Sequence, residues 1–127
     1  MPFTHLPTPL RAALSAQGYA TATPVQAAVL EEAVGVRDLI VSAQTGSGKT
    51  VAFGLAMAEG LLDGAEKFGR AQAPLALVIA PTRELALQVS RELTWLYAQT
   101  HARITTCVGG MDAMRERRAL QAGAHIV

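Results

Sequence analysis

The chain has 127 residues, a formal net charge of +1 and an apolar content of 50%. This length suits one domain, and the high apolar content with little net charge excludes an intrinsically disordered protein. The single cysteine, Cys107, excludes an internal disulfide and fits a reducing compartment. We expect no signal peptide, because the N-terminus has no basic region followed by an apolar stretch. We expect no membrane span, because polar residues interrupt the longest uncharged run. We therefore predict a cytoplasmic protein without membrane contact.

Residues 1–36 are predicted to form an N-terminal helical region. Apolar residues at helical spacing indicate a first helix that ends at Gly18. Thr23 and Pro24 are residue types typical of the N-cap and the first position of a second helix. The apolar pattern continues this second helix to Gly35.

Residues 37–127 contain short apolar runs that predict strands. The run at 38–42 indicates a strand buried on both faces, and the run at 75–80 a second buried strand. Two more strands are expected at 104–108 and 125–127, and we expect Cys107 to be a small residue of the core. Because the chain stops inside the last run, we expect a truncated piece of a longer protein.

Helices are predicted between these strands, at 49–62, 83–97 and 111–121. The stretch 63–74 contains glycine, proline and charged residues and is expected to be an exposed connector. Strands that alternate with helices of this length indicate an open parallel α/β sheet.

The glycine-rich stretch 43–50, here called the phosphate loop, follows a predicted strand and opens a predicted helix. Its glycines allow backbone N–H groups to surround a phosphate, and the helix adds the positive end of its dipole. Lys49 can reach the β- and γ-phosphates, and the Thr50 hydroxyl can ligate Mg²⁺. The alternative is a plain strand-to-helix turn. The predicted nucleotide-binding residues of the loop are Ala43, Gln44, Thr45, Gly46, Ser47, Gly48, Lys49 and Thr50.

The sequence resembles the DEAD-box ATP-dependent RNA helicase family in four stretches. Residues 18–26 look like the Q motif, and residues 43–50 match the family's phosphate loop, including its first alanine. Residues 81–86 look like motif Ia, and Gly109-Gly110 looks like the glycine doublet after the third strand. The resemblance implies a RecA-like P-loop NTPase fold, with the Q-motif region at 1–36 and part of the first RecA-like domain at 37–127.

The resemblance implies that ATP and Mg²⁺ are the cofactors. Lys49 and Thr50 would then be the catalytic residues of this stretch, and Tyr19, Thr21 and Gln26 of the Q motif would bind the nucleotide. The Gln26 amide offers a donor and an acceptor that match adenine N7 and N6. The alternative is a glutamine on a helix surface. Phe3 is the only candidate for the aromatic residue that the family has upstream of the Q motif.

The predicted RNA contacts lie in motif Ia and the glycine doublet. A cation is disfavoured at a helix N-terminus, so an arginine at position 83 suggests a phosphate partner. The alternatives are a surface arginine paired with Glu84 and, for the doublet, an ordinary turn. The charge run 115–118 is expected to be a solvated helix face that could add phosphate contacts. The predicted RNA-binding residues are Pro81, Thr82, Arg83, Gly109 and Gly110.

These features predict the ATP-binding part of an RNA helicase. The family's acidic box, its Ser-Ala-Thr motif and its second RecA-like domain would lie beyond Val127, so the expected partners are RNA and that second domain. The chain alone is then expected to bind nucleotide without hydrolysing it or unwinding RNA. The alternatives are a piece of another P-loop helicase or ATPase that acts on DNA, and an interaction module without activity.

Overall fold

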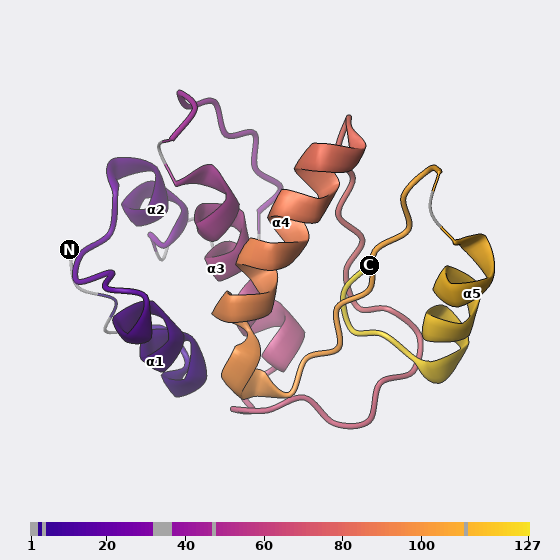
Figure 1. The fold of residues 1–127 in the computed structure, drawn as a ribbon. Coiled ribbons are helices and arrows are strands. Elements are labelled where there is room, and N and C mark those ends of the chain that lie inside the picture. The colour runs from indigo at the N-terminus through magenta and orange to yellow at the C-terminus, as the bar shows by residue number, and fades with distance from the viewer. Residues whose placement is uncertain (1–2, 4, 32–36, 47, 111) are drawn as a thin grey trace.

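The computed structural model describes residues 3, 5–31, 37–46, 48–110 and 112–127. Figure 1 shows α1 and α2 on one side, α3 and α4 in the middle, and α5 beyond the extended segments on the other side. The helical elements are α1 (Thr8–Ala16), α2 (Pro24–Val29), α3 (Lys49–Leu62), α4 (Arg83–Leu96), the short 3-10 helix η2 (Ala98–Thr100) and α5 (Ala113–Ala122).

The helix starts follow the caps that the sequence carries. Thr23 is the N-cap of α2, as predicted, and Pro24 is its first residue. Thr82 is the N-cap of α4, and its side chain accepts a hydrogen bond from the Leu85 N–H at 3.1 Å. The predicted end of α2 is wrong: the helix stops at Val29, and Gly35 lies outside the described residues.

The three C-terminal extended segments run parallel but pair only briefly. Ile126 forms parallel bridges with Ala76 on one side and with Ile104 on the other. The Val127 N–H donates to the Ala76 carbonyl at 3.1 Å, and the Thr105 N–H donates to the Ile126 carbonyl at 3.0 Å. The parallel direction is therefore confirmed for the predicted strands at 75–80, 104–108 and 125–127, whereas within the described part of the chain the strand at 38–42 forms no bridge and a full sheet is not formed.

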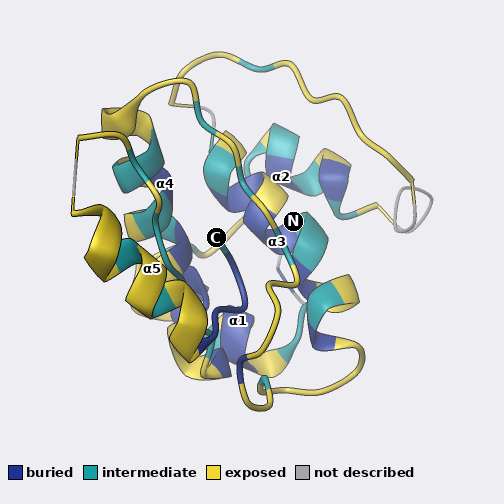
Figure 2. Ribbon diagram, turned by 90° about the vertical axis from the view of Figure 1, so that its right-hand side faces the viewer, coloured by how far each residue is buried: buried dark blue, intermediate teal, exposed yellow. Residues whose placement is uncertain are grey.

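The predicted burial of the strands at 38–42 and 75–80 is wrong. Ile40 is 102% exposed, and Leu77 and Ile79 are 71% and 85% exposed. Ala76 and Val78, by contrast, pack against the core, so burial alternates along this segment. The reason at 75–80 is that the core between α3 and α4 covers only one face of the segment, whereas a buried parallel strand needs a layer on both. At 38–42 neither face packs against the core, since Leu39 and Val41 are exposed as well. Figure 2 shows long stretches of the extended segments as exposed.

Cys107 is a further correction, because it is exposed rather than part of the core. The core instead lies between α1, α3 and α4. Gly54 allows α3 and α4 to approach closely, since a Cβ there would lie 2.8 Å from a Leu96 methyl group. The main buried side chains are Leu10, Leu14, Val51, Leu55, Leu93, Leu96, Tyr97 and Ile126.

A buried tyrosine joins α3 to the end of α4 and provides a test of this packing. The Tyr97 hydroxyl donates to the Gly54 carbonyl at 2.6 Å, and burial raises the pKa of this hydroxyl above its ordinary value of 10.0. We expect Tyr97→Phe to lower the free energy of unfolding by about 1 kcal/mol at neutral pH, because one buried hydrogen bond is lost. Urea denaturation followed by circular dichroism measures this difference.

The same hydroxyl predicts the sign of an effect at alkaline pH. The folded chain keeps the Tyr97 proton after the unfolded chain has released it, so the parent loses stability as pH rises above 10.0. Tyr97→Phe lacks this ionisable hydroxyl, so its free energy of unfolding does not change for this reason. The difference in free energy of unfolding between the parent chain and the variant should therefore narrow above pH 10.0. A gap that stays constant would contradict the burial of the hydroxyl.

Candidate functional site

The phosphate loop connects an extended segment to the start of α3. Gly46 and Gly48 have φ values of +82° and +87°, a backbone conformation that residues other than glycine rarely adopt. Gly48 is the N-cap of α3 and carries no side chain to cap it, so the first N–H groups of the helix remain available to a ligand. Ser47, a predicted phosphate contact, lies outside the described residues.

Lys49 is the first residue of α3 and reaches back across the loop. Its Nζ donates to the Ala43 carbonyl at 2.5 Å, and its side chain is exposed. An ammonium group has three donors, so two remain for phosphate oxygens. Thr50 follows on α3 and is half-buried, while Gln44 and Thr45 are exposed in the loop. The loop therefore presents one cation and a helix N-terminus at the same place.

Gln26 is fully buried between α2 and the phosphate loop. Its Oε1 accepts from the Thr23 N–H at 3.0 Å, and its Nε2 donates to the Gly48 carbonyl at 3.4 Å. A Cβ at position 48 would lie 2.5 Å from that Nε2 atom. The alternative of a surface glutamine is wrong, since Gln26 is 0% exposed. One Nε2 hydrogen and one Oε1 lone pair remain for a further partner.

The double use of Gln26 was missed by the sequence analysis, although a signal was present. Thr23 and Gln26 form a capping box, in which the threonine hydroxyl accepts from the Gln26 N–H and the glutamine oxygen accepts from the Thr23 N–H. The spacing of a threonine followed three residues later by a glutamine predicts that box. The contact with Gly48, by contrast, could not be read from the sequence, because the two residues are distant in the chain.

The other predicted nucleotide-binding residues of the Q motif, Tyr19 and Thr21, lie between α1 and α2. Tyr19 stacks on Trp95 of α4, with ring centroids 5.6 Å apart and an interplanar angle of 22°. Its N–H donates to the Leu14 carbonyl at 2.9 Å and closes the end of α1. Thr21 is exposed between α1 and α2, and Phe3 is buried in the core. Packing thus occupies the rings of Tyr19 and Phe3, and the contact of Tyr19 with a nucleotide remains a prediction.

The two predicted RNA-binding stretches meet at the carboxyl ends of two extended segments. Arg83 begins α4, and Gly110 has a φ of +77°. A Cβ at position 110 would lie 2.5 Å from Arg83 Nη2, so the guanidinium lies directly against the Gly110 backbone. Pro81, Thr82, Arg83 and Gly109 line the rim of a cleft of about 500 Å³, whose interior is mainly apolar.

Comparison with known proteins identifies the family of this chain. A family model of the DEAD/DEAH box helicases matches residues 23–127. The chain belongs to the DEAD/DEAH box helicase family. Among curated relatives of this helicase family, the DEAD-box ATP-dependent RNA helicase CshA of Bacillus licheniformis is 39% identical over 97% of this chain. The ATP-dependent RNA helicase CshA of Listeria monocytogenes is 44% identical over 87% of the chain.

Solved structures of DEAD-box proteins share the fold. The RNA helicase Prp28 from Chaetomium thermophilum, bound to ADP, aligns over 99% of this chain with a TM-score of 0.82 and 36% identity, and 30% of Prp28 is covered. A DEAD box protein from Methanococcus jannaschii aligns over 100% of the chain with a TM-score of 0.82 and 25% identity, covering 34% of that protein. This likeness supports the RecA-like part of the fold prediction.

The helicase-family chain spans only part of its relatives. It covers 24% of the Bacillus protein and 20% of the Listeria protein. Within the described ranges, none of the helices has the length and apolar character needed to cross a membrane. The same residues contain no group of three or more His, Cys, Asp or Glu side chains arranged to hold a metal ion.

Proposed function

We propose that this chain is the ATP-binding part of an ATP-dependent RNA helicase, with the Q-motif region at 1–36 and part of a RecA-like domain at 37–127. The observation that carries the proposal is the junction of Gln26, Gly48 and Lys49. In this junction the Gln26 amide lies next to the loop whose lysine and helix N-terminus can hold a triphosphate. We propose that this amide selects adenine. The names of the relatives point the same way and do not favour a DNA-acting alternative.

We propose that Thr50 provides one oxygen ligand to Mg²⁺. Mg²⁺ prefers oxygen ligands, keeps several waters and binds through substrate phosphates, so one hydroxyl from the protein fits that donor set. The ion would neutralise charge on the triphosphate, while Lys49 would hold the β- and γ-phosphates. Hydrolysis also requires a group that positions water and further cations. We therefore expect the 127-residue chain to bind nucleotide without turning it over.

RNA and a second RecA-like domain of the parent protein are the proposed partners. Arg83 and Gly110 would contact the RNA backbone, because a guanidinium and exposed backbone at the rim of a cleft suit phosphate and sugar groups rather than bases. Unwinding would then be an activity of the parent protein. A cytoplasmic location also stays a prediction, based on the single cysteine.

The ratio of ATP to GTP affinity tests the nucleotide assignment. We expect the parent chain to prefer ATP and Gln26→Ala to bring the ratio of the two dissociation constants close to one. Losing a bidentate base contact costs about 1–3 kcal/mol. Because Gln26 also supports Gly48, the variant should bind both nucleotides less tightly, so the ratio rather than the affinity reports adenine recognition. Isothermal titration calorimetry measures both constants.

Gln88→Ala is the matched control, since Gln88 is an exposed glutamine on α4. It should leave both dissociation constants unchanged. A parent chain that binds GTP as well as ATP would refute the role of Gln26 in base selection. A chain that binds neither nucleotide, while circular dichroism shows it folded, would refute the proposed function.

A further inference from the structure

One flank of α5 carries arginines that the candidate site does not use. Arg115 and Arg118 are three residues apart and lie on the same side of the helix as Ala122, whereas Arg117 projects from the other flank. None of the residues of α5 is buried. The helix has ten residues and is about 15 Å long. Its arginine-bearing flank is therefore a long exposed surface.

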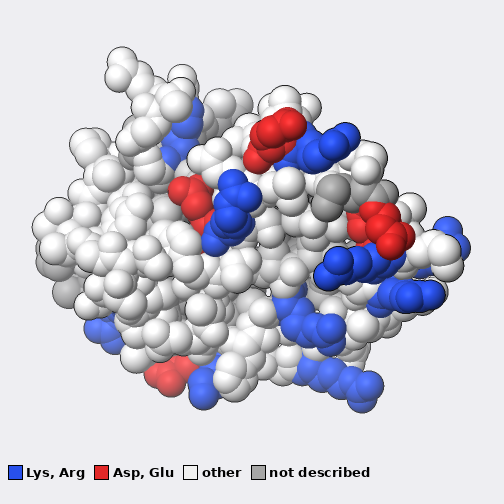
Figure 3. Space-filling view, in the orientation of Figure 1, with Lys and Arg blue, Asp and Glu red and all other residues white. Residues whose placement is uncertain are grey.

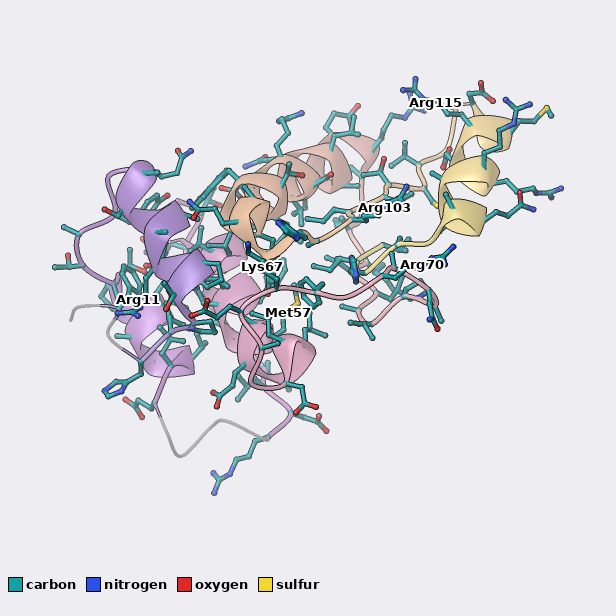
Figure 4. All side chains as sticks on the ribbon, turned by 90° about the horizontal axis from the view of Figure 1, so that it is seen from below. Arg11, Met57, Lys67, Arg70, Arg103 and Arg115 are labelled. Carbon is teal, nitrogen blue, oxygen red and sulfur yellow. The ribbon has the colours of Figure 1, made fainter. Side chains whose placement is uncertain are left out.

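A third and a fourth arginine continue this flank beyond the end of α5. Arg103 Nη1 donates to the Ala122 carbonyl at 3.3 Å, which places its guanidinium at the C-terminal end of the helix. The Arg103 N–H donates to His125 Nδ1 at 2.8 Å, and His125 Nε2, which must then carry the proton, donates to the Gly69 carbonyl at 3.0 Å. One buried imidazole thus holds the backbone next to Arg70 close to that of Arg103 (Figure 4).

We call Arg115, Arg118, Arg103 and Arg70 the arginine stripe. The two acids at and beside the start of α5 accept hydrogen bonds from the backbone. Asp112 caps α5 by accepting from the Met114 and Arg115 N–H groups, and Glu116 accepts from the Val108 N–H at 3.0 Å. Among the described residues, no hydrogen bond joins a guanidinium group of the stripe to a carboxylate.

The positive charge of the chain is concentrated in its C-terminal half, which contains the arginine stripe. From residue 67 onward it carries eight of its 11 lysines and arginines but only four of its 10 acids. Figure 3 shows these cations gathered over the side of the molecule where α5 lies. A surface of this kind attracts polyanions.

The stripe begins next to the predicted RNA contacts Arg83 and Gly110, which we call the RNA edge. α5 follows the turn at Gly110, whose backbone lies against Arg83, and Arg115 is in the first turn of the helix. From there the stripe leads along α5 to Arg103 and Arg70 at the opposite end. The cationic surface is thus continuous with the rim of the cleft.

We propose that the arginine stripe is a second RNA-binding surface, which takes the phosphates of RNA that extends past the Arg83 and Gly110 edge. This proposal rests on the proposed function, since it continues the same RNA. The planar guanidinium group of arginine can form bidentate hydrogen bonds with a phosphate group. α5 contains no aromatic residue of the kind that anchors protein partners, so RNA fits this surface better than an acidic protein segment does.

RNAs of two lengths separate the stripe from the edge. An oligouridine of about six nucleotides covers one such site, whereas one of about twenty also reaches the stripe. We expect Arg118→Gln and Arg70→Gln each to weaken binding of the longer RNA about threefold to tenfold and to lower its salt slope by about one. Both should leave the shorter RNA unaffected. Fluorescence anisotropy at several salt concentrations measures these quantities.

Arg117→Gln is the matched control, because it removes the same charge from the other flank of the same helix. It should bind both RNAs like the parent chain. Arg83→Gln tests the proposed function separately and should weaken binding of both RNAs. If Arg83→Gln weakens both while Arg118→Gln matches Arg117→Gln, the stripe is overturned and the proposed RNA edge stands.

Two further outcomes would also overturn the stripe. If the chain binds neither RNA at low salt, both the edge and the stripe fail. If polyaspartate of similar charge binds as tightly as the longer RNA and with the same dependence on Arg118, the surface does not select RNA.

Discussion

Lys49→Ala should abolish measurable binding of ATP and ADP. Lys49 is the cation of the phosphate loop that reaches across it to the Ala43 carbonyl. A charge-assisted hydrogen bond contributes about 1.5–3 kcal/mol, and each 1.4 kcal/mol corresponds to about a tenfold change in the dissociation constant. Since the ammonium can donate to more than one phosphate oxygen, we expect a loss greater than tenfold. Isothermal titration calorimetry with each nucleotide measures it.

Lys67→Ala provides the control, because Lys67 is the other lysine of the chain and lies exposed in the connector after α3. It should bind nucleotide like the parent. Circular dichroism should show both variants folded, since the Lys49 side chain is exposed and makes no contact with the core. Equal nucleotide affinity in Lys49→Ala and the parent chain would show that the phosphates bind elsewhere.

Gly48→Ala should damage both stability and nucleotide binding. The residue has a φ of +87°, and a Cβ would lie 2.5 Å from the buried Gln26 Nε2 atom. Backbone strain of this kind costs about 1–3 kcal/mol. Gln26 can give way only by losing its hydrogen bond to the Gly48 carbonyl. We therefore expect a lower melting temperature and a weaker affinity for ATP, measured by thermal denaturation and calorimetry.

Gly60→Ala makes the same chemical change where the structure predicts the opposite sign. Gly60 lies within α3, and a Cβ there would meet nothing within 4 Å. Alanine at such a helical position stabilises a protein by about 0.4–1 kcal/mol, and nucleotide binding should not change. A Gly48→Ala variant as stable as the parent chain would mean that Gln26 does not pack against the loop.

The sequence alone was sufficient for features that depend on neighbouring residues. Thr23, Pro24 and Thr82 mark helix starts because capping groups bond within four residues along the chain. The turn of the phosphate loop into α3 can be predicted for the same reason, since Gly48 is the N-cap and Lys49 the first residue of the helix that directly follows. These local interactions have the same partners whatever the rest of the chain does, so their patterns can be read directly.

Only the tertiary structure decided which distant residues meet and which apolar residues are covered. Gln26 is buried because α2 packs against the phosphate loop. Arg83 contacts Gly110 because the segments 75–80 and 104–108 run parallel on either side of 125–127 and end at the same edge. Leu77 has the apolar character of a buried strand yet is exposed, because the core covers only the face of its segment that carries Ala76 and Val78. Ile40 is exposed because neither face of its segment packs against the core. An apolar run states a preference for burial, but whether it is buried depends on what packs against it.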